Sequence, residues 1–359
     1  MPTPRLTLVT LLFDLARREP ATGRRTAKRY LELADEFVLG IDCELVAFVD
    51  PELAEPIEAS RHARGLGART RVIPIAFEDL PIYALLPKIS NARAMHPLLN
   101  GDPDKDTPLY TALICAKPAL AACIAKEDPF SGSHVGWIDI GVRHGPYRGE
   151  DPFAHPTDRV RLLSMRPLFE REIAERGPYL SALRGHIAGR YACGTRSNMA
   201  WLGAAFAQLM KETLEAGYAG SEEQLLPLLV AAQPERFEFH HGDYDDTLPN
   251  YFKPHDGAEN LAFQLRVWRE EGVPGEGAAL ARAIYDSVAR NEFNARPESL
   301  ATLLDDCFIA AWYGEPHPHP VARRIADLYL DRAERDPAFR DVFLRNEIHV
   351  RRNFSFCKS

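Results

Sequence analysis

The chain lacks the sequence signatures of several common enzyme classes. No G-x-x-x-x-G-K loop occurs in it, no G-x-G-x-x-G follows its first apolar run, and no G-x-S-x-G elbow is present. The first two absences count against the usual glycine-rich phosphate loops, and the third counts against a Ser-His-Asp hydrolase. We also find no internal repeat and no low-complexity tract.

Cysteine pairs, basic clusters and long apolar runs are absent as well. The six cysteines are scattered without a C-x-x-C pair or a zinc spacing, which is typical of reduced thiols in a cytosolic protein. The net charge of -8 argues against a nucleic-acid partner, because phosphate binding needs clustered Lys and Arg. The apolar run Leu6 to Phe13 is too short to cross a membrane and lacks the flanks of a signal peptide. We therefore expect a cytoplasmic protein without a transmembrane segment.

Alternating strand and helix patterns fill the first part of the 359-residue chain. Apolar runs at 6–15, 44–50 and 70–75 are separated by helical spacing at 26–39 and 56–63, which predicts a parallel sheet. Further helices are expected at 108–126, where Pro118 should kink or break the helix, and at 198–216. Strands are expected at 187–195 and 237–244, and surface or loop structure at 77–106 and up to about 166.

The most informative stretch is 134–145, HVGWIDIGVRHG, in which an apolar run ends on Asp139. A buried strand accommodates the apolar residues, but an ionised carboxylate needs a partner or a solvated edge. In open α/β sheets, ligands lie at the carboxyl edge of the strands, so Asp139 is a candidate for a metal or substrate contact. The alternative is an Asp that caps a turn through its own backbone.

Residues 256–359 differ from the first part, because strand signals stop and four helical patterns follow one another. We predict two domains: an α/β domain over residues 1–255 and a C-terminal helical domain over 256–359. The apolar face of the helical tail is a possible surface for a homodimer.

Seven segments, in matching order over roughly the first 250 residues, resemble the bacterial HtrL/YibB family. These segments are VTLLFDLAR, ELVAFVD, LYTALICAKPAL, GWIDIGVRHG, IAGRYACGT, GSEEQLL and FHHGDYDDTLPNY. That family looks like glycosyltransferases of the A-type fold, so the resemblance implies a single Rossmann-like, mostly parallel sheet that binds a nucleotide-sugar. The helical tail lies outside the resemblance.

The resemblance implies a divalent metal, Mn²⁺ or Mg²⁺, at Asp139. This residue takes the place of an Asp-x-Asp pair, but Gly141 stands at the second position. Such ions often need only one or two carboxylates together with phosphate oxygens. His241 is the expected second metal ligand, with Asp243 close to it, although an ordinary strand-end histidine explains the same residue.

The resemblance also suggests substrate contacts at several places along the chain. The expected substrate-binding residues are Asp14, Arg17, Arg61, Lys117, Arg190, Glu222 and Asp243. Arg61 suits a diphosphate through its planar fork, and the alternative is a solvated helix charge. Glu223 is the expected catalytic base for the acceptor hydroxyl, next to Asp139 as the other catalytic residue. Two acids at a helix start also complement the helix dipole without any catalysis.

Together these features predict a glycosyltransferase that moves a sugar from a nucleotide-sugar, uridine- or guanosine-linked, to a glycan precursor or a small-molecule acceptor. Two alternatives stay open. One is a nucleotidyltransferase on a similar sheet, which would release pyrophosphate. The other is a non-catalytic, transferase-like protein that binds a glycan or a partner enzyme after losing the carboxylate at position 141.

Overall fold

The structure, a computed structural model, divides the chain into two compact units. Unit 1 comprises Met1–Leu163 and Leu168–Phe239, and unit 2 comprises Ser164–Pro167 and His240–Ser359. The residues described are 5–19, 26–102, 106–142, 157–165, 168, 170–241, 262, 265, 274–290, 297–314, 320–337, 339 and 340. Asp243 and the side chain of His241, both named above, therefore lie outside the described residues.

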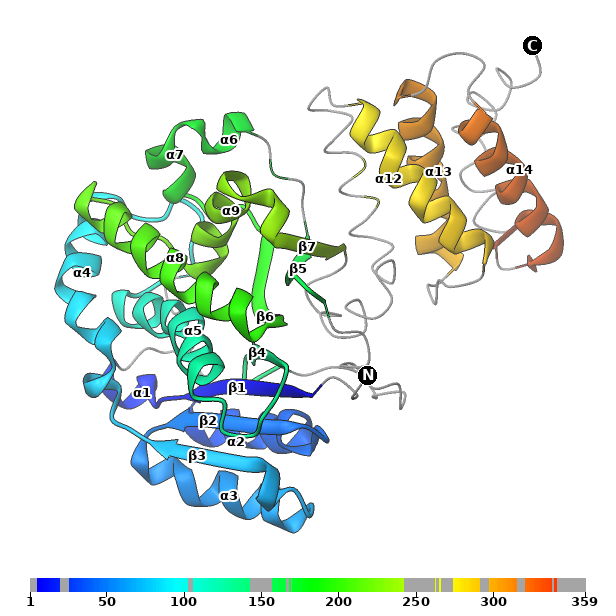
Figure 1. The fold of residues 1–359 in the computed structure, drawn as a ribbon. Coiled ribbons are helices and arrows are strands. Elements are labelled where there is room, and N and C mark those ends of the chain that lie inside the picture. The colour runs from blue at the N-terminus through cyan, green and yellow to red at the C-terminus, as the bar shows by residue number, and fades with distance from the viewer. Residues whose placement is uncertain are drawn as a thin grey trace. The chain divides into compact units, whose positions relative to one another are not determined.

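Unit 1 is built on a seven-stranded sheet in the order β3-β2-β1-β4-β6-β5-β7 (Figure 1). The first three strands and β4 run parallel, and β6 pairs antiparallel to β4. The strands are β1 (Leu6–Leu12), β2 (Glu44–Val49), β3 (Thr70–Pro74), β4 (His134–Ile138), β5 (Val160–Ser164), β6 (Ile187–Thr195) and β7 (Phe237–His241). The predicted α/β class with a mostly parallel sheet is confirmed.

Both faces of the central strands are buried, as a parallel sheet covered by helices requires. Val9, Val46 and Trp137 share one core cluster, whereas the neighbouring Leu8 and Leu45, equally inaccessible, point to the opposite face. The helices of unit 1 are α1 (Leu15–Arg18), α2 (Ala27–Glu36), α3 (Ala54–Ala63), α4 (Leu86–Met95), α5 (Pro108–Glu127), α6 (Glu170–Ala174), α7 (Arg176–Leu180), α8 (Arg196–Glu215) and α9 (Glu222–Ala232).

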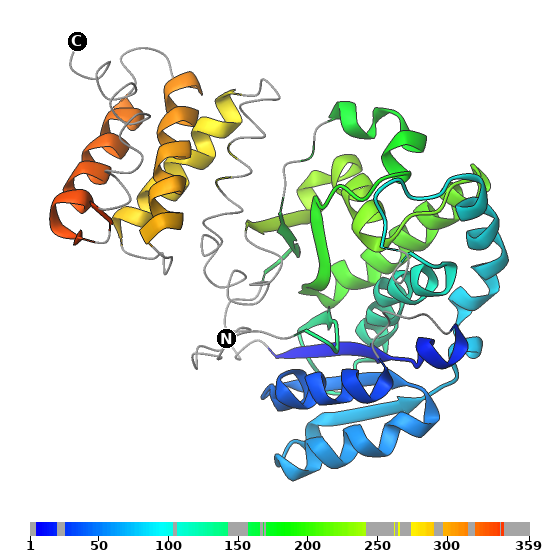
Figure 2. The same cartoon turned by 180° about the vertical axis from the view of Figure 1, so that it is seen from behind.

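Helices α5 and α8 lie side by side in both views (Figures 1 and 2). A Cβ at Gly203 of α8 would stand 2.8 Å from the carbonyl oxygen of Pro118, so glycine permits this close crossing. Helix α5 continues through Pro118 from Pro108 to Glu127, and the expected break is therefore wrong. Two elements were also missed: α4 lies in the stretch predicted as a surface excursion, and β5 lies in a predicted loop.

Unit 2 has a helical core of its own. Its described helices are α12 (Pro274–Ala289), α13 (Pro297–Gly314) and α14 (Pro320–Arg335). Apolar side chains from all three, including Ile284, Leu304 and Ile325, form one buried cluster. The helical pattern expected for the C-terminal part is confirmed for these segments.

Candidate functional site

The order of the strands reverses direction between β1 and β4, which makes this point of the sheet a topological switch point. Strands β2 and β3 follow β1 on one side, and β4 begins the other side. Thr10 of β1 donates a hydrogen bond to the carbonyl oxygen of Ile138 at 2.8 Å and so ties the ends of the two strands together. Asp14 follows β1 and Asp139 follows β4, which places both at the edge where open α/β sheets bind ligands.

Asp139 is held from behind by a buried lysine of α5. Lys117 Nζ lies 2.8 Å from Asp139 Oδ1, 2.6 Å from Glu222 Oε1 and 2.9 Å from the carbonyl oxygen of Gly189. The side chain of Lys117 is 5% exposed, whereas that of Asp139 is 36% exposed. The ammonium thus uses its three N–H groups inside the protein, and the carboxylate of Asp139 faces outward.

Glu222, the first residue of α9, is the second acid on Lys117. Glu222 is buried, and its Oε2 has no hydrogen-bond partner among the residues described. A Cβ at Gly189 would lie 2.8 Å from Glu222 Cδ and still closer to Oε1. Glycine at this position therefore allows the carboxylate to reach Lys117.

Replacing Gly189 by alanine is expected to lower the free energy of unfolding by roughly 1–3 kcal/mol, as overpacking of a core does. The added methyl group would push against a carboxylate that the Lys117 ion pair holds in place. Urea denaturation measures the change. The control is Gly40→Ala, where the nearest atom to the new methyl group is 3.8 Å away. Equal stability of the two variants would contradict this packing.

The start of β6 is fixed beside this cluster by three further contacts. Trp137 Nε1 donates to the carbonyl oxygen of Gly189 at 2.8 Å, and the backbone N–H of Gly189 donates to Glu223 Oε1 at 2.9 Å. The backbone N–H of Asp139 donates to the carbonyl oxygen of Arg190 at 2.8 Å. Glu223 and Arg190, both expected in the site, therefore flank Asp139.

The cluster has strongly perturbed electrostatics. Burial alone would lower the pKa of Lys117, but the nearby carboxylates of Asp139 and Glu222 outweigh it and raise that pKa well above its ordinary value. Burial also raises the pKa of the Tyr110 phenol well above its ordinary value, and Asp139 and Glu222 add to the effect. Tyr110, in the first turn of α5, is a neutral hydroxyl near Asp139 that the sequence did not single out.

A second polar cluster lies where β1, β2 and β3 end. Asp14 caps α1 by accepting from the N–H of Arg17 at 3.2 Å, and its own N–H donates to Asp50 Oδ2 at 2.7 Å. Arg17 is exposed and pairs with Glu52 at 2.5 Å. Both expected residues are thus at the carboxyl edge, although the carboxylate of Asp14 already serves as a helix cap.

Arg18 organises this second cluster and was missed in the sequence. It donates from two nitrogens to the buried carboxylate of Asp50, at 2.7 and 2.8 Å, and also to Glu78 at 2.7 Å. Its guanidinium lies over the ring of Phe77, 5.8 Å from the centroid. The hydrogen bond from Arg18 lowers the pKa of Glu78 to about 2. The segment FDLARR could have indicated this role, because an acid and then two arginines directly follow the first strand.

Arg18→Lys is expected to lower the free energy of unfolding by roughly 1–3 kcal/mol, because a lysine cannot reproduce the forked contact with Asp50. Arg29→Lys, on an exposed i,i+3 pair of α2, serves as the matched control.

The stabilisation that Glu78 contributes through Arg18 depends on pH, and the direction of this dependence follows from the pKa of Glu78. Since its folded pKa is depressed, that stabilisation is present above pH 4.5 and is lost as the pH falls towards 2. Thermal unfolding of the wild type and of Arg18→Lys between pH 2 and 7 measures this. If the difference in melting temperature between these two proteins did not change with pH, the assigned role of Glu78 would be contradicted.

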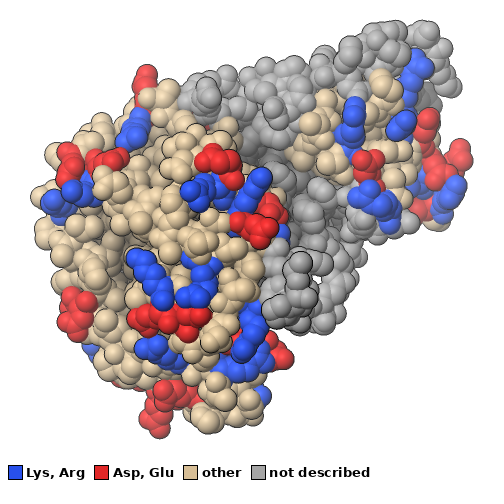
Figure 3. Space-filling model, in the orientation of Figure 1, with Lys and Arg blue, Asp and Glu red and all other residues tan. Residues whose placement is uncertain are grey.

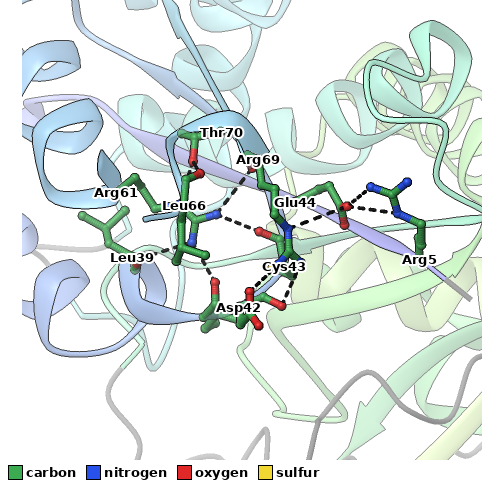
Figure 4. A network of polar contacts seen from close by, with 10 residues as sticks. Arg5, Leu39, Asp42, Cys43, Glu44, Arg61, Leu66, Arg69 and Thr70 are labelled. Atoms are coloured by element: carbon green, nitrogen blue, oxygen red, sulfur yellow. Dashed lines mark hydrogen bonds and ion pairs between the residues drawn. The ribbon is translucent and has the colours of Figure 1, made fainter. Parts of the chain in front are cut away.

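Arg61 requires a correction. It lies at the end of α3 beside the starts of β2 and β3, which is the opposite edge of the sheet from Asp139. The side chain is fully buried, and its five N–H groups donate to Thr70 Oγ1 and to backbone carbonyl oxygens (Figure 4). Burial lowers the pKa of this guanidinium. Arg61 therefore holds loops together and is not placed to bind a diphosphate at the candidate site.

Lys117 and Glu222 also need a change of role. Both were expected to contact substrate, and both are buried against each other. The structure brings them to the site, but behind Asp139, where they position that carboxylate. Of the expected residues, Asp14, Arg17, Asp139, Arg190 and Glu223 remain at or near the accessible edge.

Of the two expected metal ligands, Asp139 is the one whose side chain the structure describes. No group of three or more His, Cys, Asp or Glu side chains that would hold a metal is present among them. Lys117 contacts Asp139 Oδ1, so Oδ2 is the oxygen of this half-exposed carboxylate that does not take part in the ion pair. The other expected ligand, His241, and its neighbour Asp243 belong to the part whose side chains are not described.

Two wider properties of the chain bear on its partners. Among the described residues, α5 is the helix whose length and apolar composition would suit a membrane span, but most of it is buried within unit 1. Packing against β1, β4 and α8 accounts for that composition.

On the face in Figure 3, acidic and basic side chains of unit 1 lie interspersed.

The fold and the edge around Asp139 define a protein with one α/β sheet and a candidate ligand site at its switch point. The chain belongs to the family described as "Bacterial protein of unknown function (HtrL_YibB)", whose model matches residues 4–252. The family resemblance found in the sequence is thus confirmed.

No curated protein sequence matches the chain. Among solved structures, the apo form of mouse xyloside xylosyltransferase 1 is similar, with a TM-score of 0.37 and 12% identity over 66% of this chain and 84% of that one. A likeness this distant does not bear on the reaction.

Proposed function

We propose that the chain is a glycosyltransferase that binds a nucleotide-sugar at the carboxyl edge of its sheet, beside Asp139. The observation that carries the proposal is the accessible carboxylate of Asp139 at the switch point between β1 and β4, held by a buried lysine. A carboxylate that is partly exposed and is kept in place by a buried ion pair suits a preorganised ligand site.

A divalent ion, Mn²⁺ or Mg²⁺, is part of this proposal. Asp139 Oδ2 would be its protein ligand, and the one-carboxylate donor set fits the way such ions are held together with substrate phosphates. When bound, the ion would neutralise charge on the departing diphosphate. Arg17, which pairs with Glu52, and Arg190, whose backbone carbonyl accepts from Asp139, are the proposed phosphate contacts at the same edge. The backbone contact from Gly189 orients Glu223.

Glu223 is the proposed general base. Its Oε1 accepts from the backbone N–H of Gly189, which fixes the carboxylate next to the strand end that holds Asp139. From this place the carboxylate would take a proton from an acceptor hydroxyl within hydrogen-bond reach. The proposed acceptor is a glycan precursor or a small molecule in the cytoplasm. A homodimer through the helical unit also stays a prediction, and light scattering of the purified protein tests it.

The test is a screen of purified protein against nucleotide-sugars with and without Mn²⁺. A donor that binds the native state raises the melting temperature, and chromatography then identifies the products. Release of a nucleoside diphosphate together with a transferred or hydrolysed sugar would support the proposal. Release of pyrophosphate would indicate a nucleotidyltransferase. Failure to bind any nucleotide or nucleotide-sugar would favour a non-catalytic binding protein.

A further inference from the structure

Two carboxylates share one ammonium behind the accessible edge. When Lys117 is charged and Asp139 and Glu222 are both ionised, the cluster carries one net negative charge. Glu222 is 3% exposed, so an ion from solvent cannot reach it. The excess charge is therefore available to a ligand at Asp139, the exposed member of the cluster.

We infer that Glu222 is a positioning residue that offsets the charge of Lys117, and that the net negative charge left at the Asp139 end of the cluster gives the site its affinity for a divalent cation. If Lys117 contacted Asp139 alone, the two would form a neutral ion pair with little attraction for a cation. Glu222 Oε1 lies 2.6 Å from the ammonium, compared with 2.8 Å for Asp139 Oδ1. The buried acid thus compensates the lysine, and the charge of Asp139 is left for the ligand. The inference deepens the proposed function and rests on it for the place of the cation.

The structure shows that this arrangement has a cost that a simple ion pair would avoid. Glu222 Oε2 is buried without a hydrogen-bond partner in the described part of the chain, and a buried unpaired oxygen is unfavourable. Position 189 must be glycine to admit the carboxylate. One carboxylate is enough to neutralise the charge of Lys117, so the second buried acid, with its unpaired oxygen, indicates a role beyond stability.

Binding of Mn²⁺ alone, followed by electron paramagnetic resonance of the free ion, tests the inference without substrate. Glu222→Gln keeps the size of the side chain but makes the cluster neutral, and the dissociation constant for Mn²⁺ is expected to rise about tenfold or more. The double variant K117M/E222Q removes the ammonium as well and restores one net negative charge. It is expected to recover Mn²⁺ binding. Glu235→Gln, an exposed residue before β7, is the matched control and should bind as the wild type does.

Equal Mn²⁺ affinity in the wild type and Glu222→Gln, or no recovery in a folded double variant, would overturn the inference and leave the proposed transferase standing. A wild type that binds no Mn²⁺ would overturn the inference too. Weakened binding in Glu222→Gln together with no reaction on any nucleotide-sugar would instead support the inference and remove the proposed reaction. Circular dichroism of each variant checks that it has folded.

Discussion

Asp139→Asn is expected to lower the rate of sugar transfer at least about a hundredfold. A metal ion in such a site contributes several kcal/mol of charge stabilisation, and the proposed ion would lose the carboxylate that we assign to it. Asparagine keeps the shape of the side chain and can still accept from Lys117. Lys117 would then pair with Glu222 alone, 2.6 Å away, as a neutral buried pair. The fold should therefore persist, and the loss should be one of activity.

Product formation from the donor identified in the nucleotide-sugar screen is the measurement, with thermal unfolding recorded in parallel. The matched control is Asp327→Asn, an exposed residue of α14 in the other unit. It should transfer sugar at the wild-type rate. Full activity in Asp139→Asn would refute the role of Asp139. A large fall in melting temperature would show that the carboxylate is needed for folding instead.

The sequence predicted those parts of the fold that depend on local pattern. Apolar runs that end in an acid marked β1, β2 and β4, and the carboxyl edge followed from their parallel order. Asp139 could be placed at this edge for the same reason. Strand β5 was missed because its five residues, VRLLS, lie among prolines and charged residues that resemble a loop. Local pattern carries little information about such short elements.

Residues whose roles depend on distant parts of the chain could not be placed. The local sequence around Arg61 is typical of an exposed arginine on a helix surface. Its side chain is buried because α3 packs against the starts of two strands, which the local sequence does not show. Lys117 was recognised as a lone charge on an apolar helix that needed a partner. Its partners are Asp139 and Glu222, 22 and 105 positions along the chain, and no spacing rule connects them.

Arg18 and Asp50 show the same limitation within the second cluster. Each follows a strand, and both were visible as charges next to apolar runs. Their forked contact depends on the pairing of β1 with β2, which brings the ends of these strands together. A carboxylate as deeply buried as that of Asp50 is recognisable only once its partner is known.

Lys117→Met is expected to lower the free energy of unfolding by about 3–5 kcal/mol, the usual result of removing one partner from a buried ion pair. Methionine fills a similar volume, but it leaves the carboxylate of Glu222 buried with no positive charge beside it. The double variant K117M/E222Q removes that buried charge as well and should recover a large part of the loss. Because the folded-state pKa of Lys117 is raised, its contribution is complete below pH 10.5 and is lost only as the pH rises through that higher value.

Urea denaturation at neutral pH measures both effects on the transition of the α/β unit. Lys211→Met, at an exposed lysine of α8, is the matched control and should change stability by less than about 0.5 kcal/mol. If Lys117→Met were as stable as this control, the ammonium would contribute nothing to holding the two acids. A double variant no more stable than Lys117→Met would show that the loss comes from packing. Recovery in the double variant would show that Lys117 is needed to balance the buried carboxylate of Glu222, the same acid that is proposed to leave the cluster with a net negative charge.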